Sequence, residues 1–242
     1  MSSLSSITIA TSSLCSSPVL PMVLIAITAY LIGSVPFGYL VAKAKGIDIR
    51  QVGSHNIGAT NVFRTIGKGP GILTFLLDVL KGYVCVAFIP LLVIQFVSCD
   101  GLDHANLRLV GGLMAVIGHT WSIFLGFKGG KGVATSAGML IGISPGAVGI
   151  ALAGWIIVFL LSRYVSVASI LAAILLAILI WFEPFFVNLP TASLLTLLAA
   201  MVIIRHHANI GRLCHGTESR FAFTQAQRIA REKNTFKEGA RP

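Results

Sequence analysis

Long apolar runs, separated by shorter polar and basic stretches, form most of the chain. The runs cover residues 20–42, 70–97, 107–127, 133–161, 165–181 and 190–204. A helix that crosses a bilayer needs about 20 predominantly apolar residues, and most of these runs reach or approach that length. The pattern therefore predicts an all-α polytopic membrane protein.

The run at residues 133–161 decides how many helices the protein has. It is long for one membrane span and short for two, and a Ser-Pro-Gly sequence at Pro145 interrupts it. If the run crossed once, the basic residues after residue 204 would lie on the opposite side from those in residues 43–69, against the preference of Lys and Arg for the cytoplasmic side. We therefore expect a short helix pair broken near Pro145. This gives a seven-helix bundle with the N-terminus outside the cell.

A single membrane domain is expected over residues 20–218. Residues 1–19 are rich in serine and contain no Lys or Arg, so they lack the charged start of a signal peptide and are expected to be a disordered extension. Residues 219–242 are polar and charged, and we expect them to form a cytoplasmic tail.

Composition supports a membrane protein. Hydrophobic residues make up 55% of the chain and charged residues 11%, whereas soluble domains carry about 25% charged residues. The formal net charge is +10, and most basic residues lie between the apolar runs, as expected for loops that face anionic headgroups or anionic substrates. Nucleic acid is disfavoured as a partner, because these residues share no long polar surface with aromatic side chains beside them.

The first polar stretch, residues 53–64, combines small hydrogen-bonding side chains with one fixed cation. Its candidate residues are Ser54, Asn56, Thr60, Asn61 and Arg64. The hydroxyl and amide groups can donate hydrogen bonds to phosphate oxygens, and an arginine can bind a phosphate with two nitrogens. A loop with an Asx turn and a helix cap explains the same string equally well.

The second stretch reads Lys128-Gly129-Gly130-Lys131-Gly132. Glycine lets backbone N–H groups approach a phosphate closely, and a helix that begins near Val133 directs its positive end to the same point. A positive-inside anchor with a glycine turn explains the lysines but not the glycines. The string is not a Walker A loop, because Leu125 and Gly132 stand where that motif has Gly and Ser or Thr. We therefore expect an anion site without a nucleotide.

The third stretch, residues 205–218, places His206 and Asn209 three residues apart, on one face of a continuing helix. Histidine at this place can act as a base or bind phosphate. A zinc site built from His206, His207, Cys214 and His215 is a weaker alternative, because the spacing matches no known ligand pattern.

Ionisable residues also occur inside the apolar runs. His119 is either a satisfied bundle residue or part of a site, whereas Asp78 and Lys81, three residues apart, most simply neutralise each other. Carboxylates are scarce near the three polar stretches, so we expect chemistry that needs neither a bound metal nor another cofactor.

Several long strings resemble one family. They are GSHNIGATNVFR, GHTWSIFLGFKGGKGVAT, RYVSVASI, RHHANIGRLCHGTE, GSVPFGYL and LLDVLKG. Together they resemble the acyl-phosphate:glycerol-3-phosphate acyltransferases of the bacterial inner membrane, over about residues 30–218. His55 departs from the pattern, since the family often has Gly at this position.

The resemblance implies transfer of a fatty acyl group from acyl phosphate to the 1-hydroxyl of glycerol 3-phosphate. The products are 1-acylglycerol 3-phosphate and phosphate, in phospholipid synthesis. It further implies a seven-helix bundle with its active site on the cytoplasmic face, membrane lipid around it, and no protein nucleophile, because the phosphate of the donor assists deprotonation of the attacking hydroxyl.

The resemblance also implies roles for individual residues. The catalytic set is Ser54, Arg64, Lys131, His206 and Asn209. The substrate-binding set is Asn56, Thr60, Asn61, His119, Lys128, Gly129, Gly130, Gly132, Ser166, Ser169 and Glu218.

A transporter or exchanger of small organophosphates is the rival interpretation, since such proteins also use broken helices around an anion site. It predicts inverted repeats and charges near the bilayer centre. The sequence shows no clear repeat, and the polar stretches gather at one predicted face, so the enzyme is favoured.

Overall fold

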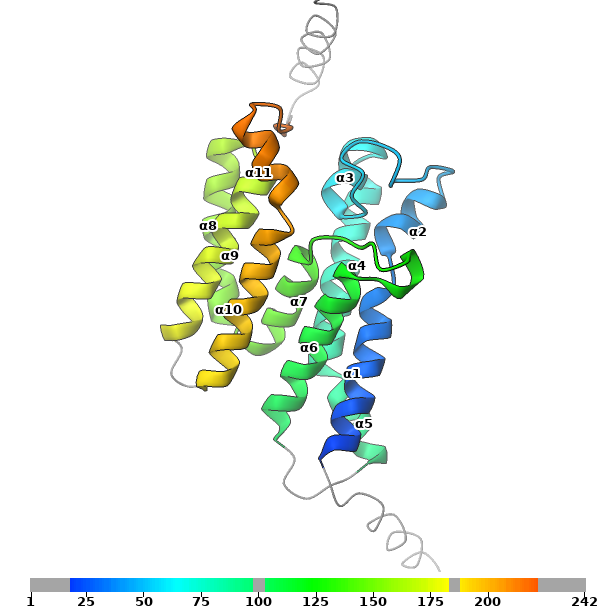
Figure 1. The fold of residues 1–242 in the computed structure, drawn as a ribbon, viewed down its shortest axis with the longest axis vertical. Coiled ribbons are helices and arrows are strands. Elements are labelled where there is room, and N and C mark those ends of the chain that lie inside the picture. The colour runs from blue at the N-terminus through cyan, green and yellow to red at the C-terminus, as the bar shows by residue number, and fades with distance from the viewer. Residues whose placement is uncertain (1–17, 98–102, 183–187, 222–242) are drawn as a thin grey trace, which may run out of the picture.

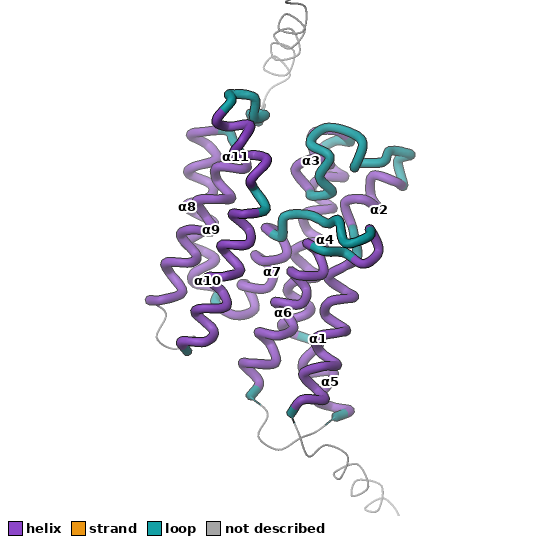
Figure 2. The backbone as a smooth tube through the Cα atoms, in the orientation of Figure 1, coloured by secondary structure: helices purple, strands orange, loops and turns teal. Residues whose placement is uncertain are grey.

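The computed structural model describes residues 18–97, 103–182 and 188–221. All regular elements in these ranges are helices, as the sequence predicted (Figures 1 and 2). The predictions for residues 1–17 and 222–242, the N-terminal extension and most of the tail, lie outside the described residues.

The first part of the chain forms one group of helices. They are α1 (Val19–Ser34), α2 (Phe37–Lys43), α3 (Ala59–Thr65), α4 (Lys68–Ala87), α5 (Ile89–Phe96), α6 (His104–Thr120) and the short 3₁₀ turn η1 (Ile123–Leu125). The first apolar run is divided between α1 and α2 because Pro36 lacks a backbone N–H and keeps the preceding residue, Val35, extended at φ −57° and ψ 115°.

The second part of the chain contains the helix break that was predicted from the distribution of basic residues. Its helices are α7 (Val133–Ile143), α8 (Pro145–Ser162), α9 (Val165–Leu179), the 3₁₀ turn η2 (Ile180–Phe182), α10 (Leu189–Ile204) and α11 (His207–Cys214). The chain turns at Ser144, and Pro145 starts α8, where its missing N–H would have no partner within the helix in any case. The predicted short helix pair is thereby confirmed.

The described helices agree with a multi-pass membrane protein. Five helical segments are long and apolar enough to cross a membrane, and α10 with α11, bent by 48°, counts as a sixth. The shorter apolar helix α7 completes the set of seven apolar segments that the sequence predicted.

The helices form two groups with α7 between them (Figure 1). The pair α8 and α9 packs with α10 on one side, whereas α1, α4 and α6 pack on the other. Glycines allow α7 to touch α4 backbone to backbone: a Cβ on Gly138 would lie 1.9 Å from Val79 O, and one on Gly82 would lie 2.2 Å from Thr135 O. Small residues at helix contacts are typical of packing in membranes.

One end of the bundle carries the polar segments. The loops at residues 44–58 and 121–132 lie toward the same end as α3 and α11 (Figure 2). We call this the polar end.

Candidate functional site

A cavity of about 680 Å³ opens among the polar segments and continues between the helices. Most of the predicted site residues line it: Ser54, Asn56, Thr60, Asn61, Arg64, His119, Lys131, Gly132, Ser166, Ser169, His206, Asn209 and Glu218. The rest of its wall is mostly apolar, from α4, α7, α8, α9 and α10. The three polar stretches thus meet at one cavity, as the topology predicted.

Lys131 and Asn209 connect two of the stretches. The Lys131 ammonium group donates a hydrogen bond to Asn209 Oδ1, and Asn209 Nδ2 donates to Glu218 Oε1 at 2.7 Å. Because the amide donates to the carboxylate, its oxygen must face the lysine. Lys131 is therefore held by a side chain whose orientation is fixed.

Glu218 is the buried carboxylate that organises this network. Ser166 Oγ donates to its Oε1 at 2.8 Å, and Arg212 Nε donates to its Oε2 at 2.7 Å. Burial alone would raise the pKa of this carboxyl, but the hydrogen bonds from Asn209, Arg212 and Ser166 hold the pKa below its usual value. Glu218 therefore stays ionised in the neutral range.

The pKa of Lys131 lies close to the neutral range, so its protonation depends on the charges around it. Burial lowers the pKa of its amine to about 8, and the positive charges of Arg212, Arg64 and Arg205 act in the same direction, whereas Glu218 opposes them. A second negative charge in the cavity, such as a phosphate, would relieve this concentration of positive charge.

His206 presents one ring nitrogen for chemistry. Its Nδ1 lies 2.7 Å from Val202 O, so in the neutral ring Nδ1 carries the proton and Nε2 is an acceptor. The side chain is buried in the cavity wall. This tautomer suits a group that accepts a hydrogen bond from a substrate hydroxyl.

The amides of the first stretch hold their own loop together. Asn61 Nδ2 donates to Val52 O at 3.0 Å and Asn56 O at 2.9 Å, and its Oδ1 accepts from Ser54 N at 3.0 Å. Asn56 Oδ1 accepts from Gly58 N at 2.7 Å, which is an Asx turn. The structural interpretation therefore applies to both amides, and their contact with a substrate stays a prediction.

Arg64 projects from α3 to the segment after Glu218. Its Nη2 donates to Ser219 O at 3.0 Å, and the ring of its neighbour Phe63 lies 5.2 Å from that of Phe221. Residues 218–221 thus cross from the α8–α9 side of the cavity to α3. Ser169 is also tied across the wall, since its Oγ accepts from Trp155 Nε1 at 3.1 Å.

The backbone N–H groups of Gly129 and Gly130, which were predicted to bind a phosphate, bind carbonyl groups of the protein instead. Their N–H groups donate to Thr120 O at 3.1 Å and His119 O at 3.0 Å, so these donors are used within the protein rather than aimed at a phosphate. A Cβ on Gly130 would lie 2.2 Å from His119 Nε2. The two glycines therefore let the loop pack against the end of α6, whereas Gly132, at φ +86°, is the residue just before α7 and lines the cavity. Lys128 is exposed.

His119 belongs to a buried ionic cluster that the sequence showed only in part. Lys81 Nζ lies 2.8 Å from Asp78 Oδ1, as the pair was predicted, and also 2.9 Å from His119 Nδ1 and 3.0 Å from Val35 O. All three side chains are almost fully buried. Since Nδ1 accepts from Lys81, the ring proton lies on Nε2, beside Gly130.

Two arginines were missed. Arg212 binds Glu218. Arg205 holds the glycine loop in place, since its Nη2 donates to Gly129 O at 3.3 Å and to Gly130 O at 3.2 Å. Both are basic residues inside the third stretch, which was the available signal. The zinc alternative finds no support in the described residues: His206 is buried in the cavity wall, whereas His207, Cys214 and His215 are exposed.

The comparisons with known proteins agree on one family. The model of the glycerol-3-phosphate acyltransferase family matches residues 23–216. This chain belongs to that family. A glycerol-3-phosphate acyltransferase from Trichlorobacter lovleyi is 47% identical over 194 residues, which are 80% of this chain and 94% of the relative. Another, from Aquifex aeolicus, is 45% identical over 195 residues, 81% of this chain and 96% of the relative.

Solved structures of a family member have the same architecture. The crystal structure of PlsY, an integral membrane glycerol 3-phosphate acyltransferase, in its glycerol 3-phosphate form is 41% identical and superposes with a TM-score of 0.73, over 83% of this chain and 96% of that one. Its lysophosphatidic acid form is 40% identical, with a TM-score of 0.71, over 83% and 95%. The chain is thus an integral membrane acyltransferase of phospholipid biosynthesis, and its described residues form helices as their only regular elements.

Proposed function

We propose that this protein transfers a fatty acyl group from acyl phosphate to the 1-hydroxyl of glycerol 3-phosphate. The observation that carries the proposal is one cavity that joins half-buried cations, amides and His206 at the polar end to an apolar interior. Such a cavity suits a donor with an anionic head and a hydrocarbon chain, together with a small anionic acceptor. The glycerol 3-phosphate and lysophosphatidic acid forms of PlsY support the same acceptor and product class.

Two cations of the cavity bind the phosphates of the two substrates. Lys131 and Arg64 both line the cavity, and ammonium and guanidinium groups form strong hydrogen bonds to phosphate. Ser54 and Thr60, which also line the cavity, add neutral donors. Gly132, at the start of α7, puts the positive end of that helix at the same place.

Acyl transfer needs no protein nucleophile in this proposal. The 1-hydroxyl oxygen attacks the acyl carbonyl carbon, a C–O ester bond forms, and the bond from that carbon to the phosphate oxygen breaks. The departing phosphate takes the hydroxyl proton. His206 Nε2 and Asn209 orient the attacking hydroxyl, and Lys131 stabilises the negative charge that develops on the carbonyl oxygen.

We propose that no metal ion or other cofactor takes part. The mixed anhydride of the donor is already activated, and fixed lysine and arginine side chains supply the positive charge that a divalent ion often supplies in phosphoryl chemistry. Carboxylates, the preferred ligands of magnesium, are few at the polar end, where Glu218 is engaged by Asn209, Arg212 and Ser166.

We further propose that the polar end faces the cytoplasm, in the bacterial inner membrane. This end carries Lys45 and Arg50 in a loop and Lys43 and Lys68 at the adjoining ends of α2 and α4, and such residues favour the cytoplasmic side. The start of α1, at the opposite end of that helix, is then outside, as is the N-terminal side of the chain in this proposal. Surrounding membrane lipid covers the many exposed apolar side chains of the helices.

A purified sample tests the proposal directly. Acyl phosphate and glycerol 3-phosphate should give 1-acylglycerol 3-phosphate and phosphate in equal amounts. A transporter of organophosphates would bind glycerol 3-phosphate without forming this product.

A further inference from the structure

One face of α9 follows the cavity along the whole helix. The cavity-lining residues of α9 and η2 are Val165, Ser166, Ser169, Ala172, Ala173, Leu176 and Ile180. Five of them, Ser166, Ser169, Ala173, Leu176 and Ile180, recur every three or four residues, which is the spacing of a single helix face. The face begins with hydroxyl groups at the polar end, continues with small alanines, and ends with larger apolar side chains.

The helix beside it shows the same gradient. The cavity-lining residues of α10, α11 and the turn between them are Asn209, His206, Val202, Ala199, Leu198 and Leu195. Here too the polar groups lie at one end, a small side chain in the middle and leucines at the other. Since both faces line one cavity, the cavity has a polar head and an apolar extension.

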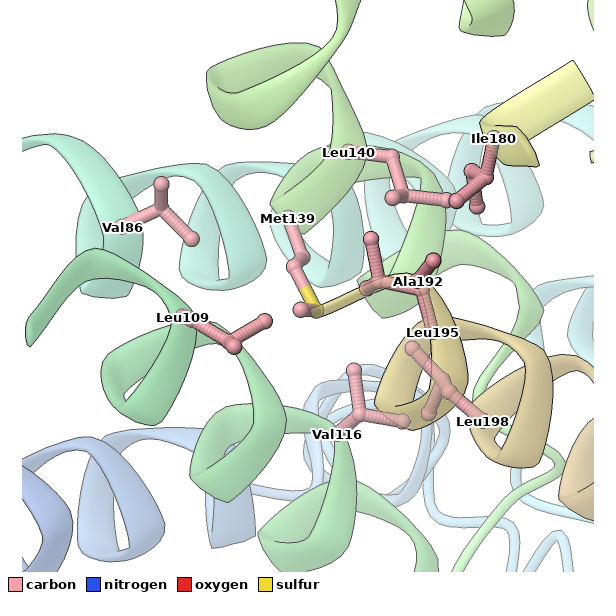
Figure 3. Close-up of a cluster of buried hydrophobic side chains, with 9 residues drawn as sticks. All are labelled: Val86, Leu109, Val116, Met139, Leu140, Ile180, Ala192, Leu195 and Leu198. Carbon is pink, nitrogen blue, oxygen red and sulfur yellow. The ribbon is translucent and has the colours of Figure 1, made fainter. Parts of the chain in front are cut away.

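The apolar extension ends in a packed cluster. Ile180 and Leu195 line the cavity, yet each is only 2% exposed, because both pack in the largest buried cluster of the described residues (Figure 3). That cluster also contains Leu140 and Ala192, from α7 and α10. Among the described residues of their helices, Ile180 and Leu195 are the cavity-lining residues farthest from the polar end.

The length of this extension can be derived from the helix. Ser166 and Ile180 are 14 positions apart, so at 1.5 Å per residue they are separated by roughly 21 Å along α9. One leaflet of a bilayer is half of a hydrocarbon core of about 30 Å, or about 15 Å. The cavity is therefore long enough for an extended acyl chain of the kind found in membranes, and it has a defined floor.

We propose that Ile180 and Leu195 form the floor of the acyl-chain pocket and set the longest chain that this enzyme uses efficiently. The proposal rests on the proposed function, because it assumes that the acyl group of the donor lies in the apolar extension. When a chain is too long, its last methylenes must either displace these two side chains from a close-packed cluster or leave the carbonyl carbon short of Lys131. Close-packed cores resist such displacement.

Truncation of the floor should lengthen the preferred chain. In Ile180→Ala and Leu195→Ala, the space vacated by the side chain can hold additional methylenes. Each methylene newly buried can favour the longer donor by up to about fourfold. We expect the preferred chain to lengthen by roughly two carbons in each variant, with the milder Ile180→Val changing the preference in the same direction by less.

The experiment is an internal competition. Purified protein receives glycerol 3-phosphate and an equimolar mixture of acyl phosphates that differ by two carbons, and the products are separated by mass. The product ratio does not depend on how much of the sample is folded, so a loss of stability alone leaves it unchanged. Leu171→Ala is the matched control, because Leu171 lies on α9 but is 43% exposed and does not line the cavity.

The proposal is supported if both alanine variants shift the product ratio toward longer chains and Leu171→Ala does not. It is overturned if Ile180→Ala, Leu195→Ala and Ile180→Val all give the wild-type ratio, or if Leu171→Ala shifts the ratio equally. Failure of the wild-type protein to use acyl phosphate of any length is a different result, which contradicts the proposed function itself.

Discussion

Lys131 and Asn209 meet at the polar end of the cavity, where the lysine ammonium group donates a hydrogen bond to the amide oxygen. The two residues come from the loop before α7 and from α11, and Asn209 extends the contact to Glu218. The contact therefore links the central helix to the outer helix group. It places a lysine whose pKa is lowered to about 8 by burial at the junction of two of the three polar stretches.

Removal of this cation should nearly abolish acyl transfer. We expect Lys131→Ala to lower kcat/KM by about two orders of magnitude or more, as for the loss of a charge-assisted contact to a transition-state anion. Initial rates on detergent-purified protein measure this. Lys45→Ala, which removes an exposed lysine from another loop, is the control and should have wild-type kinetics. Wild-type turnover by a folded Lys131→Ala protein would remove Lys131 from the mechanism.

The activity should depend on pH through Lys131. Its pKa in the free enzyme is about 8 because the amine is buried, and the protonated form binds phosphate. As the pH rises through 8, the amine loses its proton, so kcat/KM for the acyl phosphate should fall, by about tenfold per unit well above the pKa. In Lys131→Arg the cation persists, so whatever activity remains should lack this decline. An unchanged high-pH limb in Lys131→Arg would assign it to another group.

The buried cluster of Asp78, Lys81 and His119 should behave as a unit. Lys81→Met leaves the Asp78 carboxylate buried without its ammonium partner, which we expect to cost about 3–5 kcal/mol of stability. The double variant Asp78→Asn with Lys81→Met removes both charges and should be more stable than Lys81→Met alone. Thermal unfolding in detergent compares them. If the double variant loses as much stability as Lys81→Met and Asp78→Asn lose separately when the two losses are added, the charges act independently.

The orientation of the polar end can be tested by labelling. In sealed, right-side-out cells, single cysteines introduced at Gly67 and Thr217 should both be protected from an impermeant thiol reagent, because both positions lie at the proposed cytoplasmic end. Cys99, outside the described residues, should react. Labelling of position 217 but not of position 67 would place the two ends of the cavity network on opposite sides of the membrane.

The architecture was largely accessible from the sequence because lipid imposes simple rules. Apolar runs predicted the helices, and the preference of basic residues for one side required the break that the structure has at Ser144 and Pro145. The same rules brought the three polar stretches to one end. The division between α1 and α2 was missed, although Pro36 was its signal.

Atomic roles were harder to predict because they depend on contacts distant in sequence. The pair of Asp78 and Lys81 follows from helical spacing. The third member of the buried ionic cluster, His119, comes from α6 and could not be found in this way. Glycines at 129 and 130 can free an N–H group for a ligand or let two backbones approach, and only the contacts with Thr120 and His119 show the second use. Spacing alone cannot separate these alternatives.

The most direct test of the account is the reaction of the purified protein in excess EDTA. With acyl phosphate and glycerol 3-phosphate, we predict continuous turnover that releases inorganic phosphate in step with 1-acylglycerol 3-phosphate, is inhibited by added phosphate, and shows no product when acyl-CoA is the sole donor. Full activity with acyl-CoA, or loss of activity in EDTA that zinc or magnesium restores, would contradict a site in which fixed cations and an activated donor carry out the transfer.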